Sequence, residues 1–108
     1  MLEQPELGAV SLDAALRALA DPLRLRIAQT LAADGAEHAC HEFGDELSRA
    51  TMTHHFRALR EAGLVSTRIE GRNRLIRLRE DELERRFPGL VLLLRSAATT
   101  QPSVATGG

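Results

Sequence analysis

The sequence predicts a mainly α-helical domain with one small β-hairpin, on the evidence of two apolar patterns and the chain length. Apolar residues recur every three or four positions over most of the chain, which is the spacing of one face of a helix. They alternate with other residues at strand spacing in one region, residues 64–78. With 108 residues and 44% apolar content, the chain is long enough for one compact domain but too short for a catalytic domain with a separate regulator.

Residues 11–35 predict two helices, each with one apolar stripe. Asp21 can cap the free amides of the second helix, Pro22 suits its first position, and Gly35 suits the left-handed turn that ends it. The next residues, 34–46, hold five acids and no arginine, and their poor periodicity predicts a loop with a short helix. The stripes consist of Leu12, Leu16 and Leu19 on the first helix and of Leu23, Ile27 and Leu31 on the second.

A third helix is predicted between Ser48, a suitable N-cap, and Gly63, which suits the turn after the last residue. Met52, Phe56 and Leu59 share one face of it, and that face belongs in the core. Arg49 lies at the N-terminal end, where the helix dipole favours an anion. The opposite face is polar and cationic, with Ala50, Thr53, His54, Arg57 and Glu61.

The hairpin follows this helix and has arginines at and beside its tip. Val65, Thr67 and Ile69 point to one side before the turn at 71–73, and Ile76 and Leu78 continue the pattern after it. Arg72 and Arg74 are expected to contact phosphate groups, whereas Arg68 and Arg77 are assigned to the outward side of the strands.

The closing stretch is unusually apolar for the end of a small domain, which makes it a candidate dimer surface. Pro88 either kinks this helix or starts a second short one. We expect one domain at residues 11–98, between a flexible arm at 1–10 and a disordered tail at 99–108. The predicted stripe consists of Leu83, Phe87, Leu90, Val91 and Leu94.

Charge is distributed unevenly along the chain. Residues 49–79 carry eight arginines and two glutamates, a net charge of +6, and because the whole chain has a net charge of −1 the remainder carries −7. Such asymmetry indicates a basic face that meets a polyanion and an acidic body. The order of helices, basic hairpin and closing helix is that of a winged helix-turn-helix, in which a helix about 10–12 Å across fits the major groove of B-DNA.

Three stretches of the chain resemble the ArsR/SmtB family of bacterial winged-helix repressors. They are LADPLRLRIAQTLA at 19–32, TMTHHFRALREAGLV at 51–65 and EGRNRLIRL at 70–78, and the resemblance runs from about Leu12 to Leu94. It implies a homodimer, joined through the first and last helices, that binds a pseudo-palindromic operator in double-stranded DNA and releases it when an effector arrives. It assigns the dimer interface to Leu12, Leu16, Leu90, Val91 and Leu94.

The resemblance also implies which residues of the third helix contact the DNA groove. Arg49, Ala50, Thr53 and His54 match the family's groove-contact positions, and Arg57 follows one turn later. Arg49 can donate two hydrogen bonds to guanine, which would be worth about 1–3 kcal/mol of discrimination. Thr53 and His54 are better suited to a phosphate or to one base edge. His55 lies nearer the core face and is expected to support the helix.

The nature of the effector stays open at this stage. Many metal-sensing members carry two cysteines at C-x-C, whereas this chain has Cys40 alone, and no histidine follows His55 to build the family's second familiar metal site. His38, Cys40 and His41 are the remaining candidate ligands and suit nickel or zinc. Alternatively, both histidines are exposed in a loop and Cys40 packs against Phe43. Oxidation of Cys40, or an apolar small molecule at the dimer interface, would also serve.

Other classes of function find little support. The chain has no glycine-rich phosphate loop, no nucleophile elbow and no separated acid–base pair, so we expect no enzyme. It has no apolar run of about 18 residues and no signal peptide, so we expect a cytoplasmic protein without a membrane partner. The favoured function is a DNA-binding repressor. The alternatives are a metal-responsive sensor that uses residues 37–42 and a winged-helix interaction subunit that works with a protein co-regulator.

Overall fold

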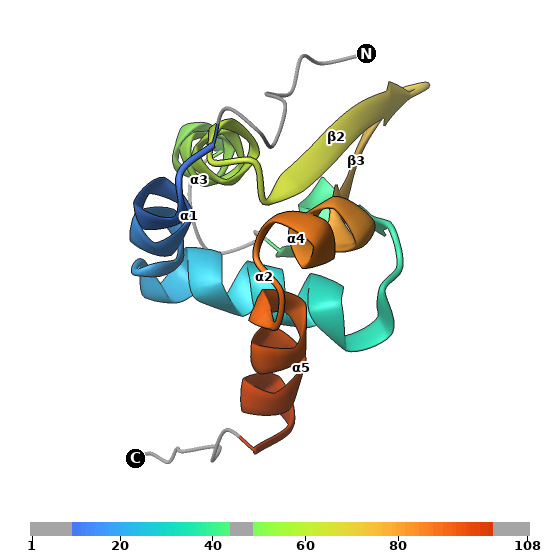
Figure 1. Cartoon of the computed structure of the whole chain (residues 1–108). Helices are drawn as coiled ribbons and strands as arrows, with labels where there is room; N and C mark the ends of the chain where they lie inside the picture. The colour runs from blue at the N-terminus through green and yellow to red at the C-terminus, as the bar shows by residue number, and fades with distance from the viewer. Residues whose placement is uncertain (1–9, 44–48, 101–108) are drawn as a thin grey trace.

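The computed structural model describes residues 10–43 and 49–100, which form one helical body with a small antiparallel sheet (Figure 1). The α-helices are α1 (Leu12–Leu19), α2 (Pro22–Asp34), α3 (Arg49–Glu61), α4 (Glu80–Arg86) and α5 (Leu90–Thr100). The strands are β1 (His38–Ala39), β2 (Val65–Glu70) and β3 (Asn73–Leu78), and the 3₁₀ helix η2 spans Cys40–Phe43. None of the described helices combines the length with the apolar composition that crossing a lipid bilayer demands.

Helix α2 begins and ends where the sequence predicts. The Asp21 carboxylate accepts hydrogen bonds from the backbone N–H groups of Leu23 (2.9 Å) and Arg24 (3.1 Å), and Pro22 occupies the first helical position. Gly35 closes the helix at φ 66°, a conformation that favours glycine. These caps fix both ends of the helix that supports α3 and α5. The predicted cap Ser48 lies outside the described residues.

The sheet has the strand order β1-β3-β2, and the hairpin β2–β3 is the wing that the sequence predicts. Gly71, at φ 62°, and Arg72 form its two-residue turn. Strand β1 was not predicted, because two residues are too few to display an alternating pattern. It pairs His38 with Ile76 and Ala39 with Leu75, so it attaches the segment before α3 to the middle of β3.

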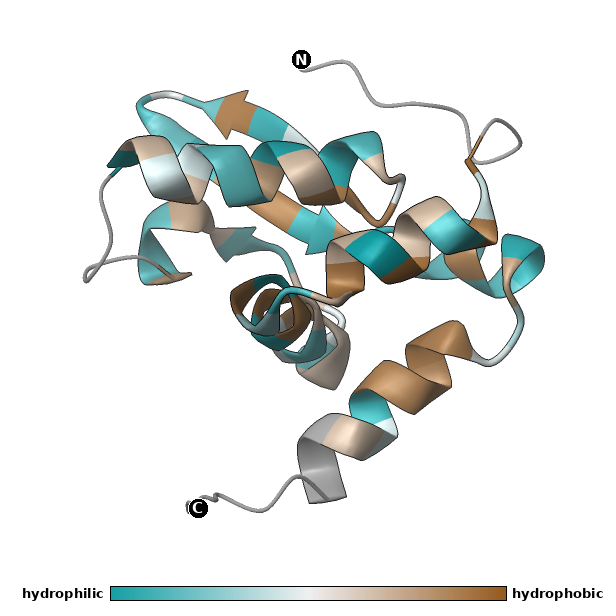
Figure 2. Ribbon diagram, turned by 90° about the vertical axis from the view of Figure 1, so that its left-hand side faces the viewer, coloured by the Kyte–Doolittle hydropathy of each residue, from teal (hydrophilic) through white to brown (hydrophobic). Residues whose placement is uncertain are grey.

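The core lies between α2, the inner face of α3, the sheet and α5. Figure 2 shows that the first turns of α5 are apolar, and α5 is in contact with α2. On α1, Leu12 and Leu16, which were assigned to the dimer interface, are 49% and 48% exposed, because α1 packs against the protomer mainly through its small side chains. The buried residues of α1 are Ala15, Ala18 and Leu19.

The two ends of the domain differ slightly from the predicted boundaries. Val10, assigned to the flexible arm, is buried, and its carbonyl accepts a hydrogen bond from Arg86 Nη2 (3.2 Å). At the other end, α5 continues to Thr100, two residues into the predicted tail. Pro88 separates α4 from α5 rather than kinking one helix. The described domain therefore runs from Val10 to Thr100, with a break at 44–48.

Candidate nucleic-acid interface

The outer face of α3 is exposed and carries the predicted groove contacts. Arg49, Ala50, His54 and Arg57 are exposed, and Thr53 is half-buried. The opposite face is buried in the core through its three predicted residues. The core therefore holds the helix in place while its outer side chains are available to a partner. The buried set is Met52, Phe56 and Leu59.

Helix α3 is also attached to α2 by Arg24, a residue that sequence reasoning did not single out. Arg24 Nη1 lies 3.3 Å from His55 Nδ1, and Arg24 Nε donates to the carbonyl of Ala18 (2.7 Å). Because a guanidinium can only donate, His55 Nδ1 is the acceptor in this contact. His55 thus supports α3, as predicted, while the neighbouring His54 is exposed.

A hollow of about 570 Å³ opens between the wing tip, η2 and the first turns of α3. Four of the seven predicted DNA contacts line it, namely Arg49, Thr53, Arg72 and Arg74, whereas Ala50, His54 and Arg57 lie outside it. Among the described residues, no carboxylate pairs with any of the three arginines. The fold thus gathers unneutralised positive charge from α3 and the wing on one side of the protein. The remaining lining residues are Cys40, His41, Met52, Phe56 and Asn73.

The arginine on the outer side of the wing has a different environment. Arg68 Nε and Nη2 each donate to the Glu37 carboxylate at 2.8 Å, and Glu70 lies 3.7 Å from Nη2. The hydrogen bond from Arg68 lowers the pKa of Glu37 and keeps it ionised. Arg68 therefore attaches the loop around Glu37 to β2. This agrees with the assignment of Arg68 to the outward side of the strand. Glu37, placed by sequence in a candidate metal segment, is this arginine's partner instead.

The candidate metal ligands His38, Cys40 and His41 do not come together. His38 lies between two carboxylates, with Nδ1 2.9 Å from Glu42 and Nε2 3.1 Å from Asp34. Cys40 is buried and His41 is exposed, because η2 turns successive side chains in different directions. Within 10–43 and 49–100, no group of three or more His, Cys, Asp or Glu side chains is placed to hold a metal ion. The described residues therefore do not bring the three candidate ligands together, and metal sensing through this segment stays a prediction.

Cys40 is also poorly suited to be a redox sensor. Burial raises the pKa of its thiol to about 11, against the small opposing effect of Arg74. The thiolate is the reactive form of cysteine, so a raised pKa makes the side chain less reactive. Cys40 instead belongs to the apolar core, against which Phe43 packs.

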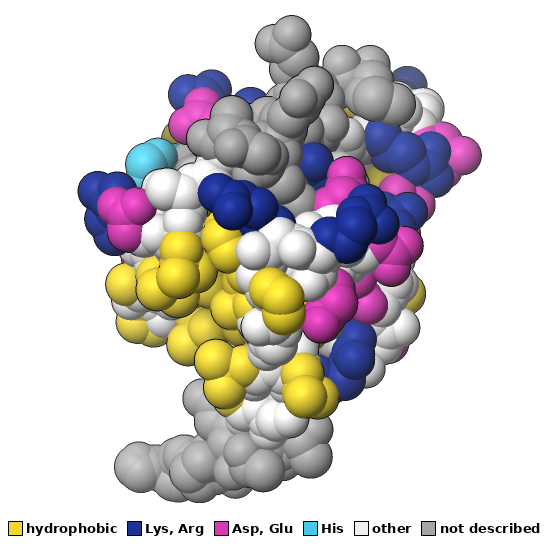
Figure 3. All heavy atoms as spheres, in the orientation of Figure 1, with side chains coloured by type: hydrophobic (Ala, Val, Ile, Leu, Met, Phe, Trp, Pro, Cys, Tyr) yellow, Lys and Arg dark blue, Asp and Glu magenta, His cyan; other side chains and the backbone are white. Residues whose placement is uncertain are grey.

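The exposed leucines lie away from this cationic side. In Figure 3, hydrophobic side chains gather around α1 and α5, and the exposed large ones there are Leu12, Leu16, Leu92 and Leu93. Of the interface residues predicted on α5, Leu90, Val91 and Leu94 are 8%, 5% and 4% exposed in the protomer, because they pack into its own core. Leu92 and Leu93, each 62% exposed, supply the free apolar face of that helix.

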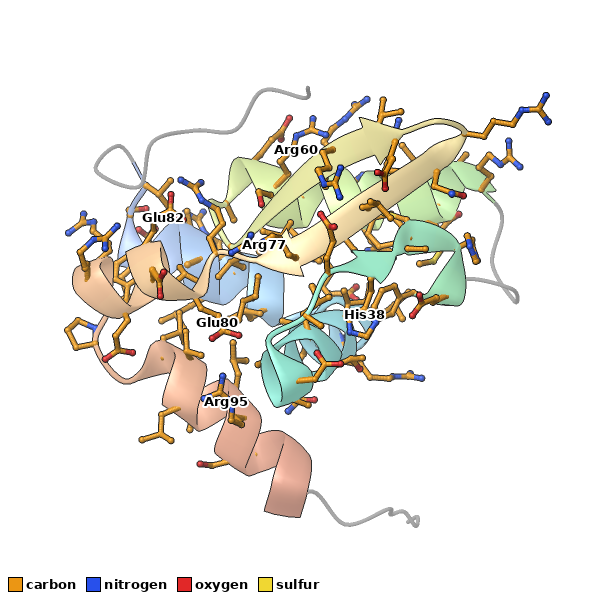
Figure 4. The ribbon with its side chains drawn as sticks, turned by 90° about the vertical axis from the view of Figure 1, so that its right-hand side faces the viewer. His38, Arg60, Arg77, Glu80, Glu82 and Arg95 are labelled. Carbon is orange, nitrogen blue, oxygen red and sulfur yellow. The ribbon has the colours of Figure 1, made fainter. Side chains whose placement is uncertain are left out.

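Polar contacts hold α5 against the rest of the fold. Arg95 Nε donates to the carbonyl of Ala32 at the end of α2 (2.8 Å), and its Nη2 donates to Glu80 Oε1 on α4 (3.2 Å). Glu80 and Arg95 face each other across α4 and α5 in Figure 4. The orientation of the exposed leucines is therefore set by contacts with two other helices.

Comparison with known proteins agrees with this geometry. A helix-turn-helix domain model matches residues 19–68, from the end of α1 into β2. The uncharacterized HTH-type transcriptional regulator YceK of Bacillus subtilis is 40% identical over 77 residues, which are 69% of this chain and 77% of that protein. The homodimeric winged helix-turn-helix DNA-binding domain Mb0332 of Mycobacterium bovis, a possible ArsR-family regulator, is 26% identical with a TM-score of 0.61 and covers 94% of this chain and 93% of its own. The chain belongs to the ArsR/SmtB family.

A second relative extends the match over more of the chain. The HTH-type transcriptional regulator CmtR of Mycobacterium tuberculosis is 39% identical over 93 residues, which are 82% of this chain and 75% of that protein. Both relatives are HTH-type transcriptional regulators, which is the class that the sequence predicts. The family assignment makes the outer face of α3 and the wing tip the candidate nucleic-acid interface.

Proposed function

We propose that this protein is a cytoplasmic, homodimeric repressor that binds a pseudo-palindromic operator in double-stranded DNA. The observation that carries the proposal is the side formed by α3 and the wing tip, where Arg49, Arg72 and Arg74 surround one hollow with no carboxylate partner in the described parts of the chain. A polyanion is the natural partner of such a surface, because neutralising phosphates releases counterions from the DNA.

Each side chain of this surface has a role suited to its chemistry. Arg49, at the start of α3, reads guanine through two hydrogen bonds, and Thr53 and His54 contact a phosphate or one base edge. Ala50 allows close approach of the helix to the groove floor, where it can contact a thymine methyl group. The remaining arginines, Arg57, Arg72 and Arg74, contact the phosphate backbone and set the register of the protein on the duplex.

The homodimer is supported by the exposed apolar residues of α1 and α5 and by the homodimeric relative from Mycobacterium bovis. Leu12, Leu16, Leu92 and Leu93 would be covered by the same residues of a second copy in a two-fold interface. Such a dimer presents two α3 helices to half-sites about 34–36 Å apart, so the operator should be pseudo-palindromic.

The test is a fluorescence-anisotropy titration onto the DNA upstream of the protein's own coding sequence, with a shuffled duplex of equal length as the reference. We expect tighter binding to the upstream DNA and a steep loss of affinity as salt rises. Arg85→Ala, an exposed arginine on α4, is the matched control and should leave affinity unchanged. Equal affinity for both duplexes would overturn sequence-specific binding. Transcription in vitro from the same promoter then distinguishes a repressor, which lowers the transcript, from an activator.

A further inference from the structure

We propose that the hollow between η2, α3 and the wing tip binds a small organic anion with an apolar body, and that this ligand and DNA exclude each other. The mutual exclusion rests on the proposed function, whereas the binding of the anion does not. The hollow, of about 570 Å³, has the size of small-molecule sites, which span roughly 300–1,000 Å³.

The inner wall of the hollow is apolar. Met52 and Phe56 reach it from the buried face of α3, and Cys40 reaches it from η2, each exposed by 9% or less. A DNA phosphate with its sugar offers little apolar surface to such a wall. An aromatic or short aliphatic group would cover it and gain the free energy of removing apolar surface from water.

The rim of the hollow is cationic. Arg49 comes from α3, and Arg72 and Arg74 come from the wing, so three guanidinium groups from two elements surround one opening. In the described structure these groups have no acidic partner, which leaves their donors available to a ligand. A planar carboxylate matches the fork of a guanidinium with two parallel hydrogen bonds. Thr53 and Asn73 add neutral polar groups beside them.

Together the wall and the rim select the class of ligand. A cation is repelled by the arginines, and a neutral apolar molecule leaves them unpaired. Because the Cys40 thiol is not poised for attack, the ligand is held without a covalent bond. An aromatic or aliphatic carboxylate satisfies both parts of the site.

The same geometry makes the ligand a direct competitor of DNA. Arg49, Thr53, Arg72 and Arg74 line the hollow and are also the proposed contacts to bases and phosphates. One guanidinium cannot form the same two hydrogen bonds with a carboxylate and with DNA. The exposed leucines of α1 and α5 take no part in the hollow, so release of DNA would need no change in the dimer.

The test uses 2-naphthoate as the probe, added to the full-length ¹⁵N-labelled protein and followed by amide chemical shifts. We expect the shifts to concentrate at the residues that line the hollow and affinity to fall about tenfold in Arg74→Gln, which loses a charge-assisted hydrogen bond. Arg85→Gln on α4 is the matched control and should bind like the unaltered protein. The neutral isostere 2-naphthylmethanol should bind at least about tenfold more weakly than the carboxylate.

Three outcomes would overturn the binding site: no shifts at the lining residues, shifts confined to α1 and α5, or equal affinity for the acid and the alcohol. The amide spectrum of Arg74→Gln shows whether that variant is folded, and Arg49→Gln provides a second variant from a different element. A competition titration with upstream DNA tests exclusion. Naphthoate that binds in the hollow without displacing bound DNA refutes exclusion. A chain that binds naphthoate but prefers no duplex refutes the proposed function and leaves the anion site standing.

Discussion

Two sides of this protein use the same residue type in opposite ways. On the side of α3 and the wing tip, Arg49, Arg72 and Arg74 have no carboxylate partner among the described residues. On the side of α4, α5 and the outer face of the wing, three arginines are paired with carboxylates: Arg95 with Glu80 (3.2 Å), Arg79 with Glu82 (3.2 Å) and Arg68 with Glu37 (2.8 Å).

The two sides differ in how much of their arginine charge is neutralised by carboxylates. Ion pairs near the surface add little stability, so the pairing on the second side matters mainly because it cancels positive charge there. On the side of α3 and the wing tip the charge of Arg49, Arg72 and Arg74 is not cancelled in this way, which favours a polyanion there. A net charge of −1 for the whole chain is therefore compatible with DNA binding.

The largest expected effect on operator affinity comes from substituting the exposed leucines, which are in neither of the two groups just compared. Leu92→Glu with Leu93→Glu should yield folded monomers, because both side chains lie outside the protomer's core. Without the linked second half-site, operator affinity should fall by roughly 10²-fold or more. Sedimentation velocity measures the dimer and anisotropy measures DNA binding.

Arg85→Glu on α4 makes the same change in net charge as this double substitution and should preserve the dimer. A double variant that stayed dimeric would remove α5 from the interface. A charge at Leu90 or Leu94 should instead unfold the protomer, because these side chains are buried. That contrast separates the two faces of α5.

A smaller and more local effect is expected from the first arginine of α3. Arg49→Ala should relax base preference at one position of each half-site, because the bidentate contact to guanine is worth about 1–3 kcal/mol. Anisotropy on duplexes with each base at that position gives the discrimination directly. If every duplex lost affinity equally, Arg49 would be a phosphate contact and the proposed readout would be wrong.

A comparison within the wing sharpens the division between free and paired arginines. Arg72→Ala should weaken binding to all sequences alike and reduce the magnitude of the salt slope by about 1, because one phosphate contact is lost. Arg68→Ala should leave DNA binding unchanged and lower thermal stability slightly, because its partner is Glu37. Equal losses of DNA affinity in the two variants would show that the ion pair opens on the DNA.

Local patterns predicted most of the secondary structure and the inner face of α3. Asp21, Pro22 and Gly35 mark the ends of α2, and the two-residue turn at Gly71 and Arg72 marks the wing, because these signals act over a few residues. The outer face of α3 was predicted together with the inner face, because it is the side of the helix opposite the core. The sequence could not predict which distant side chains pair, because each such contact depends on how whole elements pack.

Three features of the site illustrate that limit. Arg24 meets His55, and Glu37 meets Arg68, each across 31 positions of sequence, so neither pair leaves a local pattern. On α5, five consecutive apolar residues cover every face of the helix, so periodicity could not separate the buried Leu90, Val91 and Leu94 from the exposed Leu92 and Leu93. The hollow could not be predicted from local patterns either, because it depends on the relative positions of η2, α3 and the wing tip.

The smallest effect extends the comparison to the histidines. His38 is held between carboxylates, and hydrogen bonds to Glu42 and then Asp34 raise its pKa above the ordinary 6.5. The pKa of Glu42 is lowered, chiefly by His38, and that of Asp34 is lowered first by the backbone N–H of Ala36 and then by His38. Both sides of the contact are charged in the folded protein from mildly acidic pH to beyond the ordinary pKa of histidine.

His38→Gln should therefore lower the thermal midpoint in a pH-dependent way. The stabilisation from His38 is fully present below its unfolded pKa of 6.5 and is lost as pH rises through the raised folded value. That from Glu42 is present above 4.5 and is lost as pH falls through its lowered folded value. The loss on substitution should be largest near about pH 6 and smallest near about pH 9, measured by circular dichroism.

His41→Gln is the matched control, because that exposed histidine forms no ion pair with a carboxylate in the described structure, and it should lower the thermal midpoint less than His38→Gln does. A loss in His38→Gln that was equal at both pH values would mean that His38 acts through packing, for example against Phe43 at 5.9 Å between ring centroids, rather than through charge. A pH-dependent loss would place His38 with the paired arginines, as a cation neutralised by the fold. His38 would then add no net positive charge, and the charge available to DNA would be that of α3 and the wing tip.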